Sequence, residues 1–243
     1  VLYKIKETSM IKTVLFDLDG TLLPMDNDVF TKGYFKLLVK KLAPHGYSPQ
    51  ELIDGIWAGT AAMVKNDGSC TNEQAFWKKF SSVFGNKCLE DKPIFDEFYK
   101  VDFQLARGFC GFNPQAREAV KTAKACGLRL SLATNPIFPA AATESRIAWA
   151  GLDVSDFELY TTYENSHFCK PNPEYYREIL KKLQCDAKEC LMVGNDIDED
   201  MIAEELGMQV FLLKDCIINK SAKDITGYPQ GGFDELIEYI KNI

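Results

Sequence analysis

No apolar run in the sequence reaches the roughly 18 residues that a membrane-spanning helix needs, and the N-terminus lacks the apolar core of a signal peptide. The eight cysteines include no Cys-x-x-Cys pair, and there are only two histidines, which argues against a zinc cluster. The net charge of -7 argues against a general polyanion-binding surface. These absences predict a cytoplasmic protein that binds neither nucleic acid nor a membrane. We expect the cysteines to be free thiols, mostly buried.

Strand-like and helix-like segments alternate in both outer parts of the chain. Short apolar runs bounded by turn residues predict strands at residues 13–16, 128–133, 157–161, 191–193 and 209–213. Helical patterns separate these runs and close the chain, with helices beginning at Pro114 and Pro173, at about 138–150 and 198–206, and from Phe233. Strands regularly separated by helices indicate a parallel sheet with right-handed crossovers. The predicted fold class is therefore α/β, with a Rossmann-like parallel sheet.

Residues 23–109 read as an all-helical insert in this α/β pattern. Helices are expected at about 28–42, 49–65, 72–84 and 91–105. Residues 10–22 and 110–243 would then form the core domain. The aromatic residues of the insert are expected to be core rather than ligand contacts; they are Phe35, Trp57, Phe76, Trp77, Phe80, Phe84, Phe95, Phe98 and Phe103. Met10 is typical of a natural start, and the sequence leaves open whether residues 1–9 are native.

Polar side chains follow three of the predicted strands. Asp17 and Asp19 come directly after the first, Thr134-Asn135 after the second and Asn195-Asp196 after a third. Ligands of open parallel sheets bind outside the carboxyl ends of the strands, so we expect these groups to share one crevice. Taken alone, Asp17-Leu18-Asp19-Gly20 is also typical of a solvated loop or an Asx turn.

The order of these motifs resembles the haloacid dehalogenase-like superfamily. Its four motifs correspond to Phe16-Asp17-Leu18-Asp19-Gly20-Thr21, to Leu132-Ala133-Thr134-Asn135, to Lys170 in Lys170-Pro171-Asn172-Pro173, and to Val193 through Asp200. The resemblance covers residues 11–22 and 110–215. It implies a Mg²⁺-dependent phosphatase that acts on a small phosphorylated metabolite, with residues 23–109 as a cap domain of the C1 type.

The resemblance also implies a role for each site residue. Asp17 would be the nucleophile that forms an aspartyl-phosphate, and Asp19 would be the general acid and base. Mg²⁺ would be bound by the carboxylates of Asp17 and Asp196 and by the backbone carbonyl of Asp19. Asp200, one helical turn after Asp196, would orient a metal-bound water or Lys170.

The phosphoryl group would be held by three further groups. Thr134 offers a hydroxyl, the backbone N–H of Asn135 is a second donor, and Lys170 would neutralise charge on the phosphate or on Asp17. Taken separately, Lys170 could equally be an ordinary exposed lysine. His167 is expected to be a surface loop residue without a role.

Several alternatives stay open at this stage. In the fourth motif of the family the first acid commonly follows the glycine directly, but Asn195 stands at that position here. Asp198 lies between Asp196 and Asp200, so the sequence leaves open which acid faces the metal.

The function also has alternatives. Asp19 argues against a dehalogenase or a transport ATPase. A sugar-phosphate mutase would share every core residue, and a phosphonate hydrolase would need a lysine of the cap, for which Lys32, Lys36 and Lys65 are available. A catalytically idle binding protein is the alternative from another class. The substrate and the oligomeric state are also open.

Overall fold

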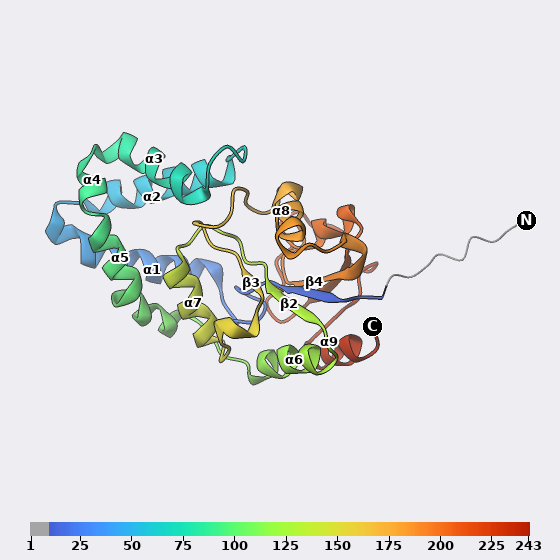
Figure 1. The fold of residues 1–243 in the computed structure, drawn as a ribbon. Helices are drawn as coiled ribbons and strands as arrows, with labels where there is room; N and C mark the ends of the chain where they lie inside the picture. The colour runs from blue at the N-terminus through green and yellow to red at the C-terminus, as the bar shows by residue number, and fades with distance from the viewer. Residues whose placement is uncertain (1–9) are drawn as a thin grey trace, which may run out of the picture.

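The structure is a computed structural model that describes residues 10–243, so the question about residues 1–9 lies outside the described residues. A six-stranded sheet with the strand order β3-β2-β1-β4-β5-β6 forms its centre (Figure 1). All of its pairings are parallel. The strands are β1 (Thr13–Phe16), β2 (Arg129–Leu132), β3 (Leu159–Tyr160), β4 (Cys190–Gly194), β5 (Gln209–Leu213) and β6 (Gln230–Gly231). This is the Rossmann strand order, and the predicted fold class is confirmed.

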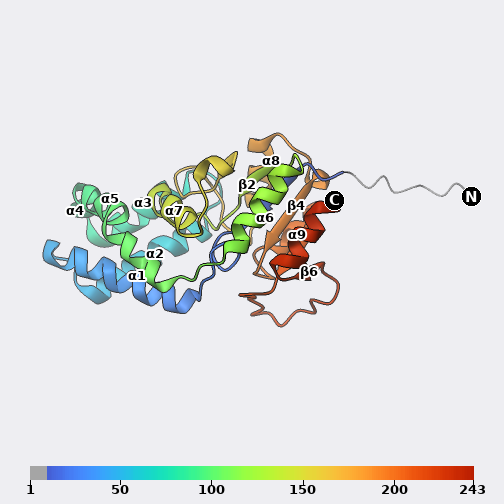
Figure 2. The same ribbon diagram turned by 90° about the horizontal axis from the view of Figure 1, so that it is seen from below.

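Helices cover both faces of the sheet. Helices α6 (Pro114–Ala125) and α9 (Phe233–Lys241) lie side by side on one face, and α8 (Pro173–Leu183) lies on the other (Figures 1 and 2). Because side chains alternate along a strand, Val14 and Phe16 of β1 join the hydrophobic cluster of α6 and α9, whereas Leu15 joins that of α8. A strand buried on both faces explains why β1 reads as a continuous apolar run.

Two Asn-Pro pairs begin helices as the sequence predicts. The side chain of Asn113 accepts the backbone N–H of Gln115 at 3.0 Å, and that of Asn172 accepts the N–H of Glu174 at 3.0 Å. Each proline stands at the first helical position, where a missing N–H costs nothing. Helix α7 (Ala140–Trp149) follows β2. Three short 3-10 helices, η1 (Ala43–His45), η3 (Val154–Asp156) and η4 (Ala187–Glu189), complete the connections.

The chain between β1 and α6 is helical. Its elements are α1 (Asn27–Leu42), α2 (Pro49–Val64), α3 (Asn72–Phe84), α4 (Lys87–Glu90), α5 (Lys92–Lys100) and the 3-10 helix η2 (Asp102–Phe109). The single helix predicted at 91–105 is wrong, because it is divided at Val101 into α5 and η2. Helix α4 was not predicted. Pro93 lacks an N–H and its ring excludes the preceding helical turn, so α4 cannot run on into α5.

Two further differences lie near the end of the chain. The helix predicted at about 198–206 ends before Gly207 as expected, but it begins only at Met201 and is the 3-10 helix η5 (Met201–Leu206). The residues before it form a turn in which Asp196 Oδ1 accepts the backbone N–H groups of Asp198 and Glu199, which delays the helix start. Strand β6 has only two residues, too few to give a periodic hydrophobic signal.

The segments that connect the helices of residues 27–109 to the sheet lie side by side. The backbone N–H of Gly111 donates to the carbonyl of Pro24 at 2.7 Å, and Met25 forms an isolated bridge with Cys110. The helices extend away from the sheet beyond the carboxyl end of β1 (Figure 1). Within residues 10–243, no helix combines the length and apolar character needed to cross a membrane.

The order of the sheet reverses at β1. The chain runs from β1 to β2 and β3 on one side, and then returns to place β4 on the other side of β1. The loops after β1 and β4 therefore diverge from a shared crevice, which is the usual ligand position in such sheets. Phe16, the last residue of β1, pairs with Val193, one residue before the end of β4, so the loops that follow these two strands start close to the same level.

Candidate active site

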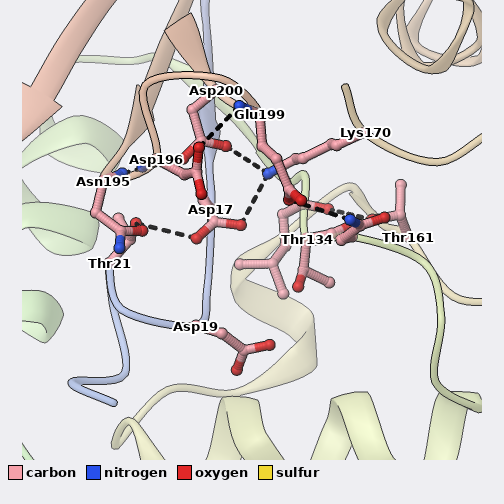
Figure 3. A network of polar contacts seen from close by, with 12 residues as sticks. Asp17, Asp19, Thr21, Thr134, Thr161, Lys170, Asn195, Asp196, Glu199 and Asp200 are labelled. Carbon is pink, nitrogen blue, oxygen red and sulfur yellow. Dashed lines mark hydrogen bonds and ion pairs between the residues drawn. The ribbon is translucent and has the colours of Figure 1, made fainter. Parts of the chain in front are cut away.

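A buried lysine joins two carboxylates in this crevice. Lys170 Nζ donates to Asp17 Oδ1 at 2.8 Å and to Asp200 Oδ1 at 2.6 Å (Figure 3). The lysine is 2% exposed. Burial alone would lower the pKa of Lys170, but the carboxylates of Asp17 and Asp200 raise it well above its ordinary value. This shift favours the ammonium form of Lys170, and the alternative of an ordinary exposed lysine is excluded by its burial.

The loop after β1 fixes the carboxylate of Asp17. Thr21 Oγ1 lies 3.0 Å from Asp17 Oδ2 and 2.8 Å from Asn195 Oδ1. Gly20 has a φ of +87°, and a Cβ there would lie 2.4 Å from Asn195 Nδ2. Glycine at position 20 thus allows both the left-handed turn and the close approach of the two loops. Each oxygen of Asp17 consequently has one partner, Lys170 or Thr21.

The loop after β4 is organised by Asp200. Its Oδ2 accepts the backbone N–H of Asn195 at 3.0 Å and that of Asp196 at 2.9 Å. A Cβ on Gly194 would lie 2.1 Å from this oxygen, so only glycine allows the carboxylate to pack against the strand end. Asp200 therefore shapes the loop and also contacts Lys170.

Asp196 and Asp198 point to different surroundings. Asp196 lines the cavity above Asp17, and Figure 3 shows their carboxylates next to each other. Asp198 instead accepts from Ser221 Oγ at 2.8 Å and pairs with Lys223 Nζ at 2.8 Å. Of the two acids, Asp196 is therefore the one that faces Asp17. The amide of Asn195 donates to the carbonyl of Cys216 at 2.7 Å and supports the loop from behind.

The loop after β2 brings Thr134 and Asn135 to the same cavity. The carbonyl of Thr134 accepts from Thr161 Oγ1 at 2.6 Å and from Tyr175 Oη at 2.8 Å, which fixes this residue at the strand end. Asn135 Nδ2 donates to Glu199 Oε2 at 3.1 Å. Burial raises the pKa of Glu199 to about 7. Glu199 also lines the cavity, and sequence reasoning gave it no role although it lies inside the fourth motif.

Asp19 lies apart from the other site carboxylates (Figure 3). Arg146, on α7, is 1% exposed and donates through its guanidinium to Asp19 Oδ2, while Asp19 Oδ1 is buried without a hydrogen-bond partner among the described residues. Burial raises the pKa of Asp19, although Arg146 acts in the opposite direction. Sequence reasoning missed Arg146. The available signal was a single arginine among Ala142, Ile147 and Trp149 on the buried face of a helix.

The donor atoms at these strand ends fit Mg²⁺. Asp17 and Asp196 supply carboxylate oxygens on one cavity, and hard oxygen donors are the ligands that Mg²⁺ prefers. No group of three His, Cys, Asp or Glu side chains in residues 10–243 forms a ready metal site. The ligands expected for Mg²⁺ from the protein are only the carboxylates of Asp17 and Asp196 and the backbone carbonyl of Asp19. Mg²⁺ commonly takes its other ligands from phosphate and water.

A cavity of about 250 Å³ extends from Asp17 to the helices of residues 27–109. Five of the aromatic residues that were expected to be core line it; they are Phe35, Trp57, Phe76, Trp77 and Phe95. Four of them are also buried, but Trp57 is 51% exposed. The expectation of a core role is therefore wrong for Trp57 and incomplete for the other four. His167 lies in a loop, where its Nδ1 is 2.8 Å from Glu178 Oε1.

Comparison with known proteins identifies relatives over most of the chain. The chain is 26% identical over 210 residues to a glyceraldehyde 3-phosphate phosphatase of Methanothermobacter thermautotrophicus. This alignment covers 84% of the chain and 86% of the relative. The chain is also 26% identical over 204 residues to a phosphoglycolate phosphatase of Vibrio parahaemolyticus. This second alignment covers 83% of the chain and 82% of the relative.

Solved structures share the fold. A HAD phosphatase from Thermococcus onnurineus has a TM-score of 0.59 at 17% identity and covers 95% of this chain and 98% of its own. A 2-haloacid dehalogenase from Pseudomonas syringae has a TM-score of 0.62 at 20% identity. The superposition covers 96% of this chain and 99% of the dehalogenase. A family model described as haloacid dehalogenase-like hydrolase matches residues 11–204. Since that match runs from β1 through the loop that holds Asp196 and Asp200, the chain belongs to the haloacid dehalogenase-like hydrolase family.

Proposed function

We propose that the protein is a Mg²⁺-dependent phosphatase that hydrolyses a small phosphorylated metabolite through an aspartyl-phosphate on Asp17. The observation that carries this proposal is the environment of Asp17. Its carboxylate lies at the switch point of the sheet, is held by Lys170 and Thr21, and lies next to Asp196 at the floor of a cavity. Two relatives over more than four-fifths of the chain are phosphatases by name.

The residues around Asp17 suit phosphoryl transfer. A carboxylate repels a phosphate dianion, and the ammonium of Lys170 offsets part of that repulsion. Bound Mg²⁺ would neutralise further charge on the phosphoryl oxygens, held by Asp17, Asp196 and the carbonyl of Asp19. Thr134 and the backbone N–H of Asn135 would orient the phosphoryl group, since both residues line the cavity.

Asp19 is proposed as the group that protonates the leaving oxygen and later accepts a proton from water. Burial raises the pKa of Asp19, which favours the protonated form that an acid needs. Asp19 Oδ1, which has no hydrogen-bond partner within residues 10–243, is free to carry that proton, while Arg146 holds Oδ2. Asp200 and Arg146 are positioning residues, since they act through Lys170 and Asp19.

Residues 23–109 are proposed to be a cap domain, with residues 10–22 and 110–243 as the core domain. The paired segments at Pro24 and Gly111 support this boundary, because the chain leaves and re-enters the core at one place. Lys32, Lys36 and Lys65 are absent from the cavity wall formed by residues 10–243, which argues against a phosphonate hydrolase that uses a cap lysine. A cytoplasmic location stays a prediction, and so does the choice of water over a sugar hydroxyl as phosphoryl acceptor.

A screen of phosphorylated metabolites with the full chain tests this function. We expect phosphate release in Mg²⁺ that stops in EDTA, returns when Mg²⁺ is restored, and is lost in Asp17→Asn. Asp215→Asn, on an exposed residue after β5, is the matched control and should retain activity. The absence of turnover on every substrate would favour the idle binding protein. Isomerisation of a sugar phosphate without phosphate release, followed by NMR, would favour the mutase.

A further inference from the structure

The wall of the cavity is divided between charged and uncharged surfaces. Its acidic side chains and its two cations, Arg146 and Lys220, all come from residues outside 23–109. In the described chain, residues 23–109 give this wall only uncharged side chains, most of them aromatic. A phosphate monoester with its phosphoryl group at Asp17 would therefore place its leaving group against an uncharged, aromatic surface.

The buried cations next to the site are already paired. Arg146 donates to Asp19, and its Nε and Nη2 contact the carbonyl of Ala142 and the hydroxyl of Thr143, each at 3.3 Å. Lys170 is held by Asp17 and Asp200. Lys220 is exposed on the loop after β5. Among the described residues, the part of the wall formed by residues 23–109 offers no cation, so a carboxylate or second phosphate buried against these aromatic side chains would be unfavourable.

Trp57 is the clearest sign of a ligand surface. It lies on α2, lines the cavity and is 51% exposed, which is unusual for a side chain that gains so much from burial. Its ring centroid is 5.5 Å from that of Phe35 at an interplanar angle of 60°. Both rings line the cavity, and the half-exposed indole still has apolar surface that an aromatic ligand could cover.

Gly59 allows Phe76 to pack closely against α2. A Cβ at this helical position would lie 2.5 Å from the ring of Phe76, so glycine lets that ring pack against the backbone of α2. Glycine is a poor helix former, and its presence here is explained by this close approach. Gly55, one turn earlier, contacts Phe84 in the same way, but Phe84 does not line the cavity within the described chain.

The size of the cavity limits the ligand. A cavity of about 150 Å³ holds one benzene molecule. The volume of about 250 Å³ therefore accommodates a phosphoryl group and one ring. We infer that the substrate is a phosphate monoester whose leaving group is uncharged and carries an aromatic ring, bound against Phe35, Trp57 and Phe76. This inference rests on the proposed function and defines its substrate class.

Two alkyl phosphates with similar leaving oxygens test the inference. The full chain in Mg²⁺ is expected to hydrolyse 2-phenylethyl phosphate with a kcat/KM about 10- to 100-fold above that of ethyl phosphate, because the phenyl ring is buried in the complex. Phosphoglycolate, which carries a carboxylate, should be the poorest of the three. Equal values for the two alkyl phosphates, or a preference for phosphoglycolate, would overturn the inference.

Acetyl phosphate separates this inference from the proposed function. Its leaving group is too small to reach the aromatic wall, so its hydrolysis reports the chemistry at Asp17 alone. Hydrolysis of acetyl phosphate without preference for the phenyl substrate would refute only the substrate class. A binding measurement gives a second readout: by calorimetry, 2-phenylethyl phosphonate should bind at least about tenfold more tightly than ethyl phosphonate. Equal binding would also overturn the inference.

Substitutions in α2 localise the effect. Trp57→Ala should reduce the ratio of kcat/KM for 2-phenylethyl phosphate over ethyl phosphate by about tenfold. Val64→Ala, at another exposed apolar position of the same helix, should leave the ratio unchanged. Gly59→Ala should lower the ratio by displacing Phe76, and circular dichroism checks that all variants fold. An unchanged ratio in folded Trp57→Ala and Gly59→Ala would contradict the assignment.

Discussion

The guanidinium of Arg146 donates to the carboxylate of Asp19 although the two residues are 127 positions apart in the sequence. Arg146 is buried on α7, and the ring of Phe138 lies 4.6 Å from its Cζ. The ion pair therefore connects the loop after β1 to the helix after β2. It holds one oxygen of Asp19 and leaves the other buried without a partner among the described residues.

Arg146→Gln is expected to lower kcat by about 10- to 100-fold with little change in KM, because Asp19 loses its orientation while the phosphate contacts remain. Arg146→Lys should recover part of the loss, since it restores a cation. The measurement is steady-state hydrolysis of ethyl phosphate, whose alkoxide leaving group needs a proton, with Arg117→Gln as an exposed control on α6. If KM rose and kcat stayed constant, Arg146 would be a substrate ligand rather than a positioning residue.

Removal of Lys170 should destabilise the fold. Lys170→Met would leave Asp17 and Asp200 buried without their shared cation, and breaking a buried ion pair in this way costs about 3–5 kcal/mol. Urea denaturation measures the loss in the free energy of unfolding.

The exposed pair of Lys121 and Glu118 supplies the matched control for Lys170→Met. Its atoms lie 3.1 Å apart, and Lys121→Met should cost less than about 1 kcal/mol. Equal free energies of unfolding for Lys170→Met and Lys121→Met would show that the buried cluster is not held by its lysine.

Glu178 on α8 fixes the loop that leads to Lys170. It accepts the backbone N–H of His167 at 3.0 Å and pairs with Lys182 Nζ at 2.8 Å. Burial alone would raise the pKa of Glu178, but Lys182 and His167 lower it below its ordinary value. A lowered pKa in the folded state stabilises the protein above the unfolded-state pKa, and this contribution is lost as the pH falls through the folded-state value.

The Tm of Glu178→Gln should therefore fall below that of the unmodified chain near neutral pH, and the difference should shrink as the pH is lowered through about 4. Thermal unfolding followed by circular dichroism measures both. Glu174→Gln, in an exposed pair with Arg177, should show little difference at any pH. A Tm difference for Glu178→Gln that is independent of pH would contradict the assigned ion pair.

The cysteines differ in exposure. All eight are free thiols, as predicted, but only Cys88, Cys169 and Cys190 are buried, so the expectation that most are buried is wrong. Burial raises the pKa of Cys169 to about 12, which keeps this thiol protonated at neutral pH. Iodoacetamide should therefore modify exposed Cys126 first and leave Cys169 unmodified, as peptide mass spectrometry would show. Early modification of Cys169 would contradict its buried position.

The strand ends could be predicted because their signals are local. The four-residue apolar run before Asp17 and the Gly194 turn after β4 each specify an abrupt end of a buried strand, and parallel topology then brings these ends together. The helix boundaries at Pro114 and Pro173 were also local, since Asn-Pro both caps and begins a helix.

The missed features depend on tertiary contacts. Nothing near Arg146 in the sequence indicates that its partner is Asp19, and helical spacing alone cannot distinguish a core aromatic from one that lines a cavity, as with Trp57. The 3-10 helix η5 begins later than the predicted helix because the residues before it are used in the Asp196 turn. These errors fall where side chains from distant segments meet.

Every proposed role at the site depends on Asp17 accepting the phosphoryl group. The most direct measurement is rapid acid quenching of the full chain during turnover of acetyl phosphate in Mg²⁺, followed by peptide mass spectrometry. We predict that one phosphoryl group is found on the peptide that contains Asp17, and that Asp17→Asn shows neither this peptide nor turnover. A phosphorylated residue elsewhere, or undiminished turnover by Asp17→Asn, would show that Asp17 is not the nucleophile.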